Sequence, residues 1–324
     1  MNPMTPATAP ATPPPAGAVP IEGARRQPGR TRSFLGQVLR RNDGRFGVLI
    51  LVMFTVLALF PDLFVGKLET ATTATGQSLQ PPGGGYLFGT DELGRDVFNM
   101  TVHGARISMA IGLMATMITV LVGALLGIIA GYVGGRVDTV IMRISDFFLV
   151  LPTIVLAIIL APVILDVVGA DAELFGIRAT MIVIVVVIGL TSWAVTARII
   201  RSQVLSIKMR MFVDRARVVG SGPGRIMRRH VLPNVINLIV AQAVLTFAVA
   251  VFTETTLAFI GLGDPFAPSW GQILNAAQSA GAPGLGAWWY IVPPAVCVVL
   301  VVLAFTLVGN ALDDVLNPKS GARR

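Results

Sequence analysis

The sequence of 324 residues contains one cysteine, two histidines and few charged residues. The single cysteine, Cys297, cannot form an intrachain disulfide, and His103 and His230 do not have the spacing of a metal-ligand pair. Only 13% of the residues are charged, about half the fraction typical of soluble domains, whereas 54% are hydrophobic. These shortages argue against a disulfide-rich domain, a metal site and an ordinary soluble protein.

Apolar runs of about twenty residues recur along the chain, and each is long enough to cross a hydrocarbon core of about 30 Å as a helix. We therefore predict an all-α polytopic membrane protein with six transmembrane helices. The third span contains Pro152. The predicted spans cover residues 46–65 and approximately 107–133, 140–165, 177–197, 235–257 and 290–308.

Small residues recur in the second predicted span, where Gly123, Gly127 and Gly131 are spaced by four. Such a spacing places the glycines on one helix face and lets a neighbouring backbone come close. We predict tight packing of this face against another helix of the bundle or against a partner.

Residues 1–33 differ from the rest of the chain, since they are rich in proline, alanine and threonine. They carry too little apolar bulk to offset the entropy of ordering, so we predict a disordered leader. It does not resemble a cleaved signal peptide, because the first apolar run is too long for an h-region. The predicted organisation is this leader, a first helix with its following segment at 34–105, a five-helix core at 106–311 and a tail at 312–324.

The net charge of +8 indicates membrane orientation rather than nucleic-acid binding, because the basic residues flank the apolar spans. Seven arginines lie between residues 25 and 45, and nine lysines and arginines lie between 198 and 229. The connection between the third and fourth spans is acidic instead. With an even number of spans, the bias predicts that both termini and the fourth connection lie in the cytoplasm.

The fourth connection, residues 198–234, is a long basic stretch between two apolar runs. We predict a helix that ends at Gly220, because glycine adopts the left-handed conformation at low cost. A second short helix is expected to follow, with Ser221 as its cap and Pro223 in its first turn, and to end before Pro233. On composition alone, such a loop also suits contact with anionic lipid.

The spacing within this connection resembles the EAA motif of the membrane subunits of ABC importers. Asp-Arg-Ala at 214–216 is followed by Gly220, then by His230, then by Leu232 and Pro233. In that family the loop is a coupling helix that docks into a cytoplasmic ATPase subunit. The resemblance implies a coupling role for Asp214, Arg215, Ala216, Arg217, Gly220, His230, Leu232 and Pro233.

Two arginines of this stretch are expected to meet charged groups of a partner. Arg215 stands where the family has a small residue, so close docking at this point requires a matching carboxylate on the ATPase. Arg217, like Arg225, is expected to face acidic groups of the ATPase or lipid phosphate.

Further stretches narrow the resemblance to one permease of the dipeptide, oligopeptide and nickel ABC importers. They are FGTDELGRDVFNMTVHGARISM before the second span, RHVLPN, TTLAFIGLGDPFAPSWGQIL and the ending NALDDVLNP. The resemblance covers about residues 35–318. It implies a type I permease fold, a second unlike permease, two cytoplasmic ATPase subunits and an extracytoplasmic substrate-binding protein in a prokaryotic plasma membrane. Peptide, nickel and other small solutes remain open as substrates.

The chain has no G-x-x-x-x-G-K-[ST] motif, so it cannot cradle nucleotide phosphates itself. It is therefore expected not to be an enzyme and to hold no cofactor, while partner ATPase subunits bind ATP and Mg²⁺. A secondary transporter or channel is the alternative class, but such proteins usually show more intramembrane charges or discontinuous helices at mid-membrane. An intramembrane enzyme lacks support, because no catalytic constellation is visible.

Glu254 is the most prominent intramembrane carboxylate. A carboxylate within an apolar span usually faces a cavity or a partner. It either lines the path or fixes a gate, or it lies near the outer interface and bonds a neighbouring threonine or backbone group.

Two segments are expected on the outer side. Trp270, Trp288 and Trp289 suit the headgroup level. Before the second span, a local ion-pair cluster is expected from Asp91, Glu92, Arg95 and Asp96.

Overall fold

The computed structural model describes residues 36, 38–169, 172–174 and 176–316, which all belong to one compact unit, Phe34–Arg324. The predicted leader at 1–33 and residues 317–324 of the predicted tail lie outside the described residues.

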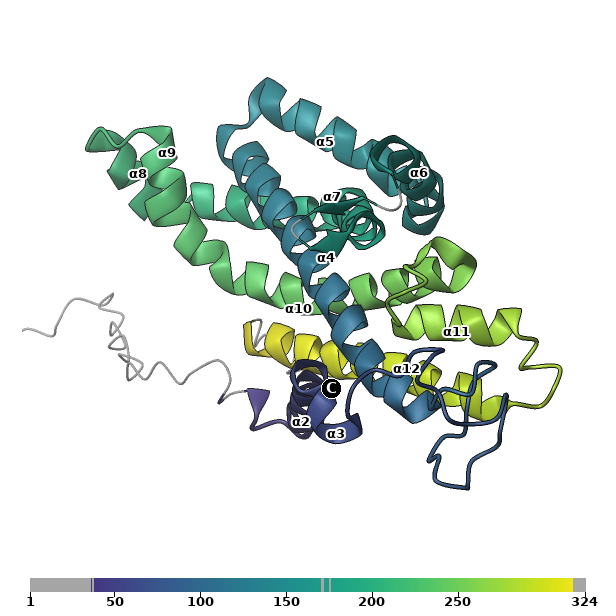
Figure 1. Cartoon of the computed structure of the whole chain (residues 1–324). Helices are drawn as coiled ribbons and strands as arrows, with labels where there is room; N and C mark the ends of the chain where they lie inside the picture. The colour runs from purple at the N-terminus through teal and green to yellow at the C-terminus, as the bar shows by residue number, and fades with distance from the viewer. Residues whose placement is uncertain (1–35, 37, 170–171, 175, 317–324) are drawn as a thin grey trace, which may run out of the picture. The chain divides into compact units, whose positions relative to one another are not determined.

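The described chain is mainly helical (Figure 1). Five helices are long and apolar enough to cross a membrane, and the bent pair α5–α6 gives the sixth span that the apolar runs predict. Two π turns, η1 and η2, flank α10, and a short antiparallel hairpin, β1–β2, precedes α7. The elements are α2 (Asn42–Leu59), α3 (Pro61–Val65), α4 (Val97–Val133), α5 (Gly135–Val150), α6 (Thr153–Val168), β1 (Glu173–Leu174), β2 (Ile177–Arg178), α7 (Ala179–Lys208), α8 (Met211–Val218), α9 (Pro223–Ile226), η1 (Met227–Val231), α10 (Leu232–Leu257), η2 (Ala258–Leu262), α11 (Trp270–Ser279) and α12 (Trp288–Leu316).

The third span is not one continuous helix, contrary to the prediction for residues 140–165. It breaks between α5 and α6, whose axes bend by 94°. Leu151 has an extended backbone, with φ −82° and ψ 128°, and Pro152 has ψ 120°. Proline offers no N–H to continue a helix, and its ring disfavours the helical conformation of the preceding residue. The same proline that the sequence places inside the span therefore divides it.

The glycine face of α4 packs closely on α7, which confirms the prediction from its spacing. A Cβ atom added to Gly127 would lie 2.5 Å from the carbonyl oxygen of Ala197. A Cβ atom on Gly131 would lie 2.8 Å from Cβ of Val204. Any side chain at these positions would push the two helices apart.

The start of α2 and the end of α12 lie at the same end of the bundle. Arg41 forms an ion pair with Asp314 at 2.9 Å. Val38, Ala241 of α10 and Val308 of α12 belong to one buried cluster. This arrangement suits an even number of membrane crossings.

The segment before α4 is fixed by hydrogen bonds rather than by a four-residue ion cluster. Asp91 and Arg95 form an ion pair at 2.6 Å. Asp96 instead caps α4 by accepting a hydrogen bond from the backbone N–H of Phe98 at 2.8 Å. Asn99 donates its side-chain amide to the carbonyl of Val65, which ties this segment to the end of α3.

Trp270 is a core residue, so its predicted place at the headgroup level is wrong. It is fully buried, and its indole N–H donates to the carbonyl of Thr101 at 2.9 Å. Gly104 makes room for it, since a Cβ there would lie 3.0 Å from the indole ring. Trp288, in contrast, is 59% exposed.

The contact between α4 and α7 yields a stability prediction. We expect Gly127→Leu to lower the free energy of unfolding by about 1–3 kcal/mol, because the added side chain overpacks the contact. Thermal unfolding of the detergent-purified protein measures this change. Leu121→Phe, which adds bulk at a site on α4 that is 70% exposed, is the control. Equal unfolding midpoints for the two variants would contradict the role of the glycine face.

Candidate functional site

The basic stretch at 198–234 forms a short helix, α8, in the turn between α7 and α10 (Figure 1). α7 ends at Lys208, and α8 begins at Met211. The single helix predicted up to Gly220 is therefore divided at residues 209–210. We call α8 with its two turns, residues 209–222, the α8 segment.

The end of α8 is set by Gly220, as predicted. Gly220 has a φ of +84°, the left-handed region that glycine adopts without steric cost. Its N–H donates to the carbonyl of Arg217, and the N–H of Ser221 donates to the carbonyl of Ala216. This pair of bonds is the Schellman pattern that satisfies the last carbonyls of a helix. Ser221 is not the cap of the next helix, however, because Gly222 occupies that position.

The helix that follows does not end before Pro233, contrary to the prediction. It runs from Pro223 through η1 and α10, and its backbone leaves the helical conformation only at Gly261, with a φ of +92°. Pro233 cannot donate a backbone hydrogen bond, and the wider π turn of η1 lies directly before it. The side-chain amide of Asn234 donates to the carbonyl of His230, one turn earlier, at 2.7 Å. The second half of the basic stretch is thus a rigid extension of the fifth span.

One face of α8 is buried in the bundle. Val213 has no exposed surface and belongs to a cluster with Val204 of α7, Ile226 of α9 and Val235 of α10. Ala216 packs against the same cluster. Burying an aliphatic side chain such as valine stabilises the contact by about 1.5–3 kcal/mol. α8 is therefore held against the ends of α7 and α10.

The other face of α8 is exposed and carries apolar side chains. Met211 is 71% exposed and Val218 is 88% exposed. Asp214 and Arg217, which lie between them, form an exposed ion pair at 3.0 Å. Exposed apolar side chains next to charged ones are typical of a protein contact surface. Sequence reasoning missed these apolar residues. Because α8 is a short helix with Val213 on its buried face, residues on the opposite face are exposed.

Cationic contacts connect α8 to the end of α4. The ring of Tyr132 lies 5.7 Å from the guanidinium carbon of Arg217 and 5.8 Å from Nζ of Lys208. Such cation–π contacts are worth about 0.5–1 kcal/mol at exposed sites. Arg201 of α7 also binds Asp138 of α5 with two hydrogen bonds, of 2.5 and 2.6 Å. The ends of α4, α5, α7 and α8 thus form one connected group.

The predicted coupling residues fall into two sets. Those at 214–217 and Gly220 lie on α8 and its turn, where Arg215 is exposed. His230 packs near α8, with its ring 6.3 Å from that of Phe212. Leu232 and Pro233 lie further along the continuous helix.

Glu254 is buried near the other end of α10, with 1% of its surface exposed. The hydroxyl of Thr255 donates to its carboxylate at 3.4 Å. The hydroxyls of Ser108 on α4 and Ser269 at the start of α11 lie beside it. Its role at a path or gate stays a prediction.

The described helices form a bundle long and apolar enough to cross a membrane, and α8 is packed at one end of it with one face exposed. Residues 123–321 match the model of the family described as the inner membrane component of binding-protein-dependent transport systems. The chain belongs to this family of ABC importer permeases, which are not catalytic themselves and work with an ATPase and a substrate-binding protein.

Curated relatives share this assignment over most of their length. The chain is 38% identical to the dipeptide transport system permease protein DppC of Bacillus subtilis, over 82% of this chain and 80% of the relative. It is 34% identical to the oligopeptide permease OppC of the same organism, over 84% of each chain. A putative peptide permease of Brucella suis is 33% identical over 87% of this chain and 90% of its own.

A solved structure shows the same fold. The methionine ABC transporter MetNI, in an inward-facing conformation, matches with a TM-score of 0.52 over 68% of this chain and 95% of the matched chain. The sequence identity is 19%, so the likeness concerns the fold alone. The predicted type I permease fold is thereby confirmed.

The two faces of α8 yield a matched prediction. Val213→Ala should destabilise the attachment of α8 by roughly 1–3 kcal/mol, because it removes buried methyl groups. Val218→Ala, the same change on the exposed face, should leave stability unaltered. Hydrogen exchange of the backbone amides at 211–219 measures the difference. Equal protection in both variants would show that α8 is not held by Val213.

Proposed function

We propose that the chain forms half of a peptide translocation path in an ATP-driven importer and couples this path to cytoplasmic ATPase subunits. The observation that carries the proposal is the α8 segment, which is buried on one face and exposed on the other. Peptide is proposed over nickel or another small solute because the relatives reported above are named for peptides. Because the chain belongs to the family of ABC importer permeases, the alternative class of secondary transporter is not favoured.

In this proposal the exposed face of α8 docks on the ATPase. Met211 and Val218 supply apolar contact, and Arg215 meets a carboxylate of the partner. Closure of the ATPase subunits displaces α8, and the buried Val213 carries the displacement to the ends of α7 and α10. The remaining predicted residues, Asp214, Ala216, Arg217, Gly220, His230, Leu232 and Pro233, shape or hold this segment.

The complete importer in this proposal contains a second, unlike permease, two ATPase subunits that bind ATP and Mg²⁺, and an extracytoplasmic binding protein. In this proposal the cofactors belong to the ATPase subunits rather than to this chain. Both termini and the α8 segment face the cytoplasm of a prokaryotic cell. The ion pair of Arg41 with Asp314 supports a common side for the termini, and the nine basic residues between 198 and 229 support the cytoplasmic side.

Transport by the reconstituted complex tests the proposal. The chain is purified with its partner permease and ATPase subunits, placed in liposomes with ATP at the ATPase side, and supplied with the binding protein. We expect ATP-dependent uptake of a labelled peptide that unlabelled peptide suppresses and nickel does not. Uptake of nickel in place of peptide would overturn the substrate, and a chain that binds no ATPase would overturn the coupling.

Gly220 offers a test of the coupling geometry with an internal control. Gly220→Val forces a β-branched residue into the left-handed region, at a cost of about 1–2 kcal/mol, and should distort the end of α8. Gly222→Val is the control, because Gly222 has a φ of −65° and no atom within 4 Å of an added Cβ. We expect the first variant to lose peptide uptake several-fold while the complex still hydrolyses ATP, and the second to transport normally. Normal transport by both variants would contradict the role of the α8 segment.

A further inference from the structure

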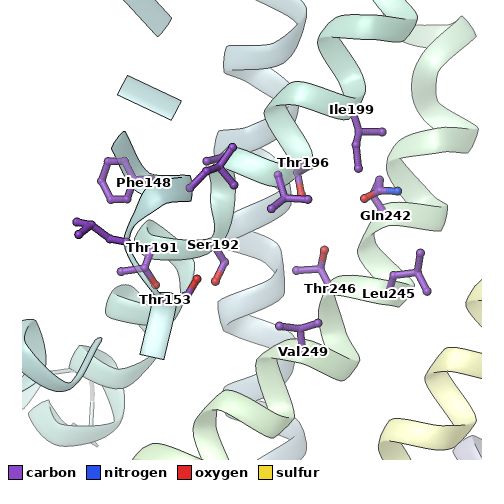
Figure 2. Close-up of a pocket in the computed structure, with 14 residues that line it drawn as sticks. Phe148, Thr153, Thr191, Ser192, Thr196, Ile199, Gln242, Leu245, Thr246 and Val249 are labelled. Atoms are coloured by element: carbon purple, nitrogen blue, oxygen red, sulfur yellow. The ribbon is translucent and has the colours of Figure 1, made fainter. Parts of the chain in front are cut away.

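A cavity of about 390 Å³ lies between α7, α10 and the break between α5 and α6 (Figure 2). α7 contributes residues between Thr191 and Ile199, and α10 contributes residues between Gln242 and Val249. Phe148, Leu151 and neighbouring residues of the break complete the wall. The volume lies within the range of ordinary ligand pockets, about 300–1,000 Å³.

The cavity lies near the midpoints of the helices α7 and α10, toward the end of the fourth predicted span, 177–197. α7 extends from Ala179 to Lys208 and α10 from Leu232 to Leu257, so each contributes residues from near its midpoint. The break at 151–152 divides α5–α6 into two helices of 16 residues. Irregular backbone at this depth is tolerated where it is buried in protein or lines a water-filled cavity. Interrupted helices at mid-membrane are a feature of substrate sites in transporters.

The wall of the cavity is polar but uncharged. None of the fourteen described residues that line it is charged. Only Thr191 makes a side-chain hydrogen bond within the described chain, to the carbonyl of Val187 at 2.8 Å; the other five polar side chains make none. Figure 2 shows Thr196 of α7 and Thr246 of α10 on facing helices, with their hydroxyls directed into the space between them. The polar lining residues are Thr153, Thr191, Ser192, Thr196, Gln242 and Thr246.

Hydrogen-bonding groups without partners are costly in hydrocarbon, by several kcal/mol each for transfer to a medium that forms no hydrogen bonds. Five such groups around one cavity therefore indicate a wet surface that a polar solute crosses, rather than a lipid-facing one. Hydroxyl and carboxamide groups both donate and accept hydrogen bonds. A free divalent cation would instead require carboxylate or imidazole ligands.

We propose that this cavity is the mid-membrane part of the path and that its hydroxyls and Gln242 bind the backbone amides of an extended peptide. The proposal rests on the proposed function and adds the residues and the chemistry of recognition to it. Because the wall holds no fixed charge, it favours neither acidic nor basic peptide side chains. Recognition is directed at the group that all peptides share.

Substitution of one hydroxyl on α7 and one on α10 tests the proposal. The double variant Ser192→Ala, Thr246→Val removes hydrogen-bonding groups and retains most of the side-chain volume. We expect peptide uptake by the reconstituted complex to fall about tenfold, since each lost hydrogen bond is worth about 0.5–1.5 kcal/mol. Assembly and ATP hydrolysis should be unchanged. Thr256→Val is the control, because its hydroxyl bonds the carbonyl of Phe252 in its own helix and lies outside the cavity wall.

A labelling experiment supplies a readout independent of rate. In a Cys297→Ala background, Thr246→Cys should react with a water-soluble thiol reagent, and transported peptide should slow that reaction. Leu125→Cys, on an exposed face of α4, should be inert when the face meets lipid. If the Thr246→Cys variant reacts and peptide does not slow the reaction, the proposal is wrong. It is also wrong if the second permease buries this site.

The proposed function and the assignment of the cavity are overturned by different results. If the unaltered complex takes up no peptide, the proposed function is wrong. If the unaltered complex transports peptide and the Ser192/Thr246 double variant transports at the same rate, only the assignment of the cavity is wrong.

Discussion

The close approach of α4 and α7 is the contact on which both proposed sites depend. Gly123, Gly127 and Gly131 leave no side chain between the two backbones, so α7 lies directly on α4 along about two turns. At one end of this contact, Gly123 meets Thr196, a residue of the cavity wall. At the other end, Tyr132 follows Gly131 and reaches Lys208 and, on α8, Arg217. In a bilayer the hydrophobic effect does not drive helices together, so this packing has to supply the attachment.

Two prolines, each preceded by a leucine, have opposite effects, and the difference shows where sequence reasoning stops. At Pro152 the preceding residue is extended and the span divides. At Pro233, which lies two residues after the π turn η1, the helix continues. Proline alone predicts a break or a kink in each case. Which one occurs depends on neighbours that a local pattern does not reveal.

The features that were predictable are those with a local cause. The length of the apolar runs predicts the spans, and the spacing of the glycines predicts the packing face of α4. Gly220 predicts the end of α8, because a residue in the left-handed conformation is needed there. Trp270 was misplaced because its burial depends on Gly104, which lies 166 positions earlier in the chain. The cavity wall was also out of reach, since it joins residues between 148 and 249 that no motif connects.

The helix that runs from Pro223 through α10 connects the α8 segment directly to the cavity. Val235 packs in the cluster that holds α8, and Gln242 of the cavity lies two turns further along, about 10 Å away. An uninterrupted helix transmits a displacement over that length without a hinge to absorb it. In the proposed function, the polar wall of the cavity therefore moves with α8 rather than with the lipid-facing surface.

Glu254 lies buried near the far end of the same helix. This buried carboxylate lies next to hydroxyls of α4 and of the start of α11, and its Oε1 has no hydrogen-bond partner in the described chain. We propose that these neighbours hold α10 where the helix leaves the cavity. A carboxylate at such a position is costly unless its neighbours satisfy it, and separating those neighbours would expose the cost again. A helix held at one end and displaced at the other changes its tilt. The cavity, which lies between the two ends of α10, is the place where such a change of tilt alters the spacing between α7 and α10.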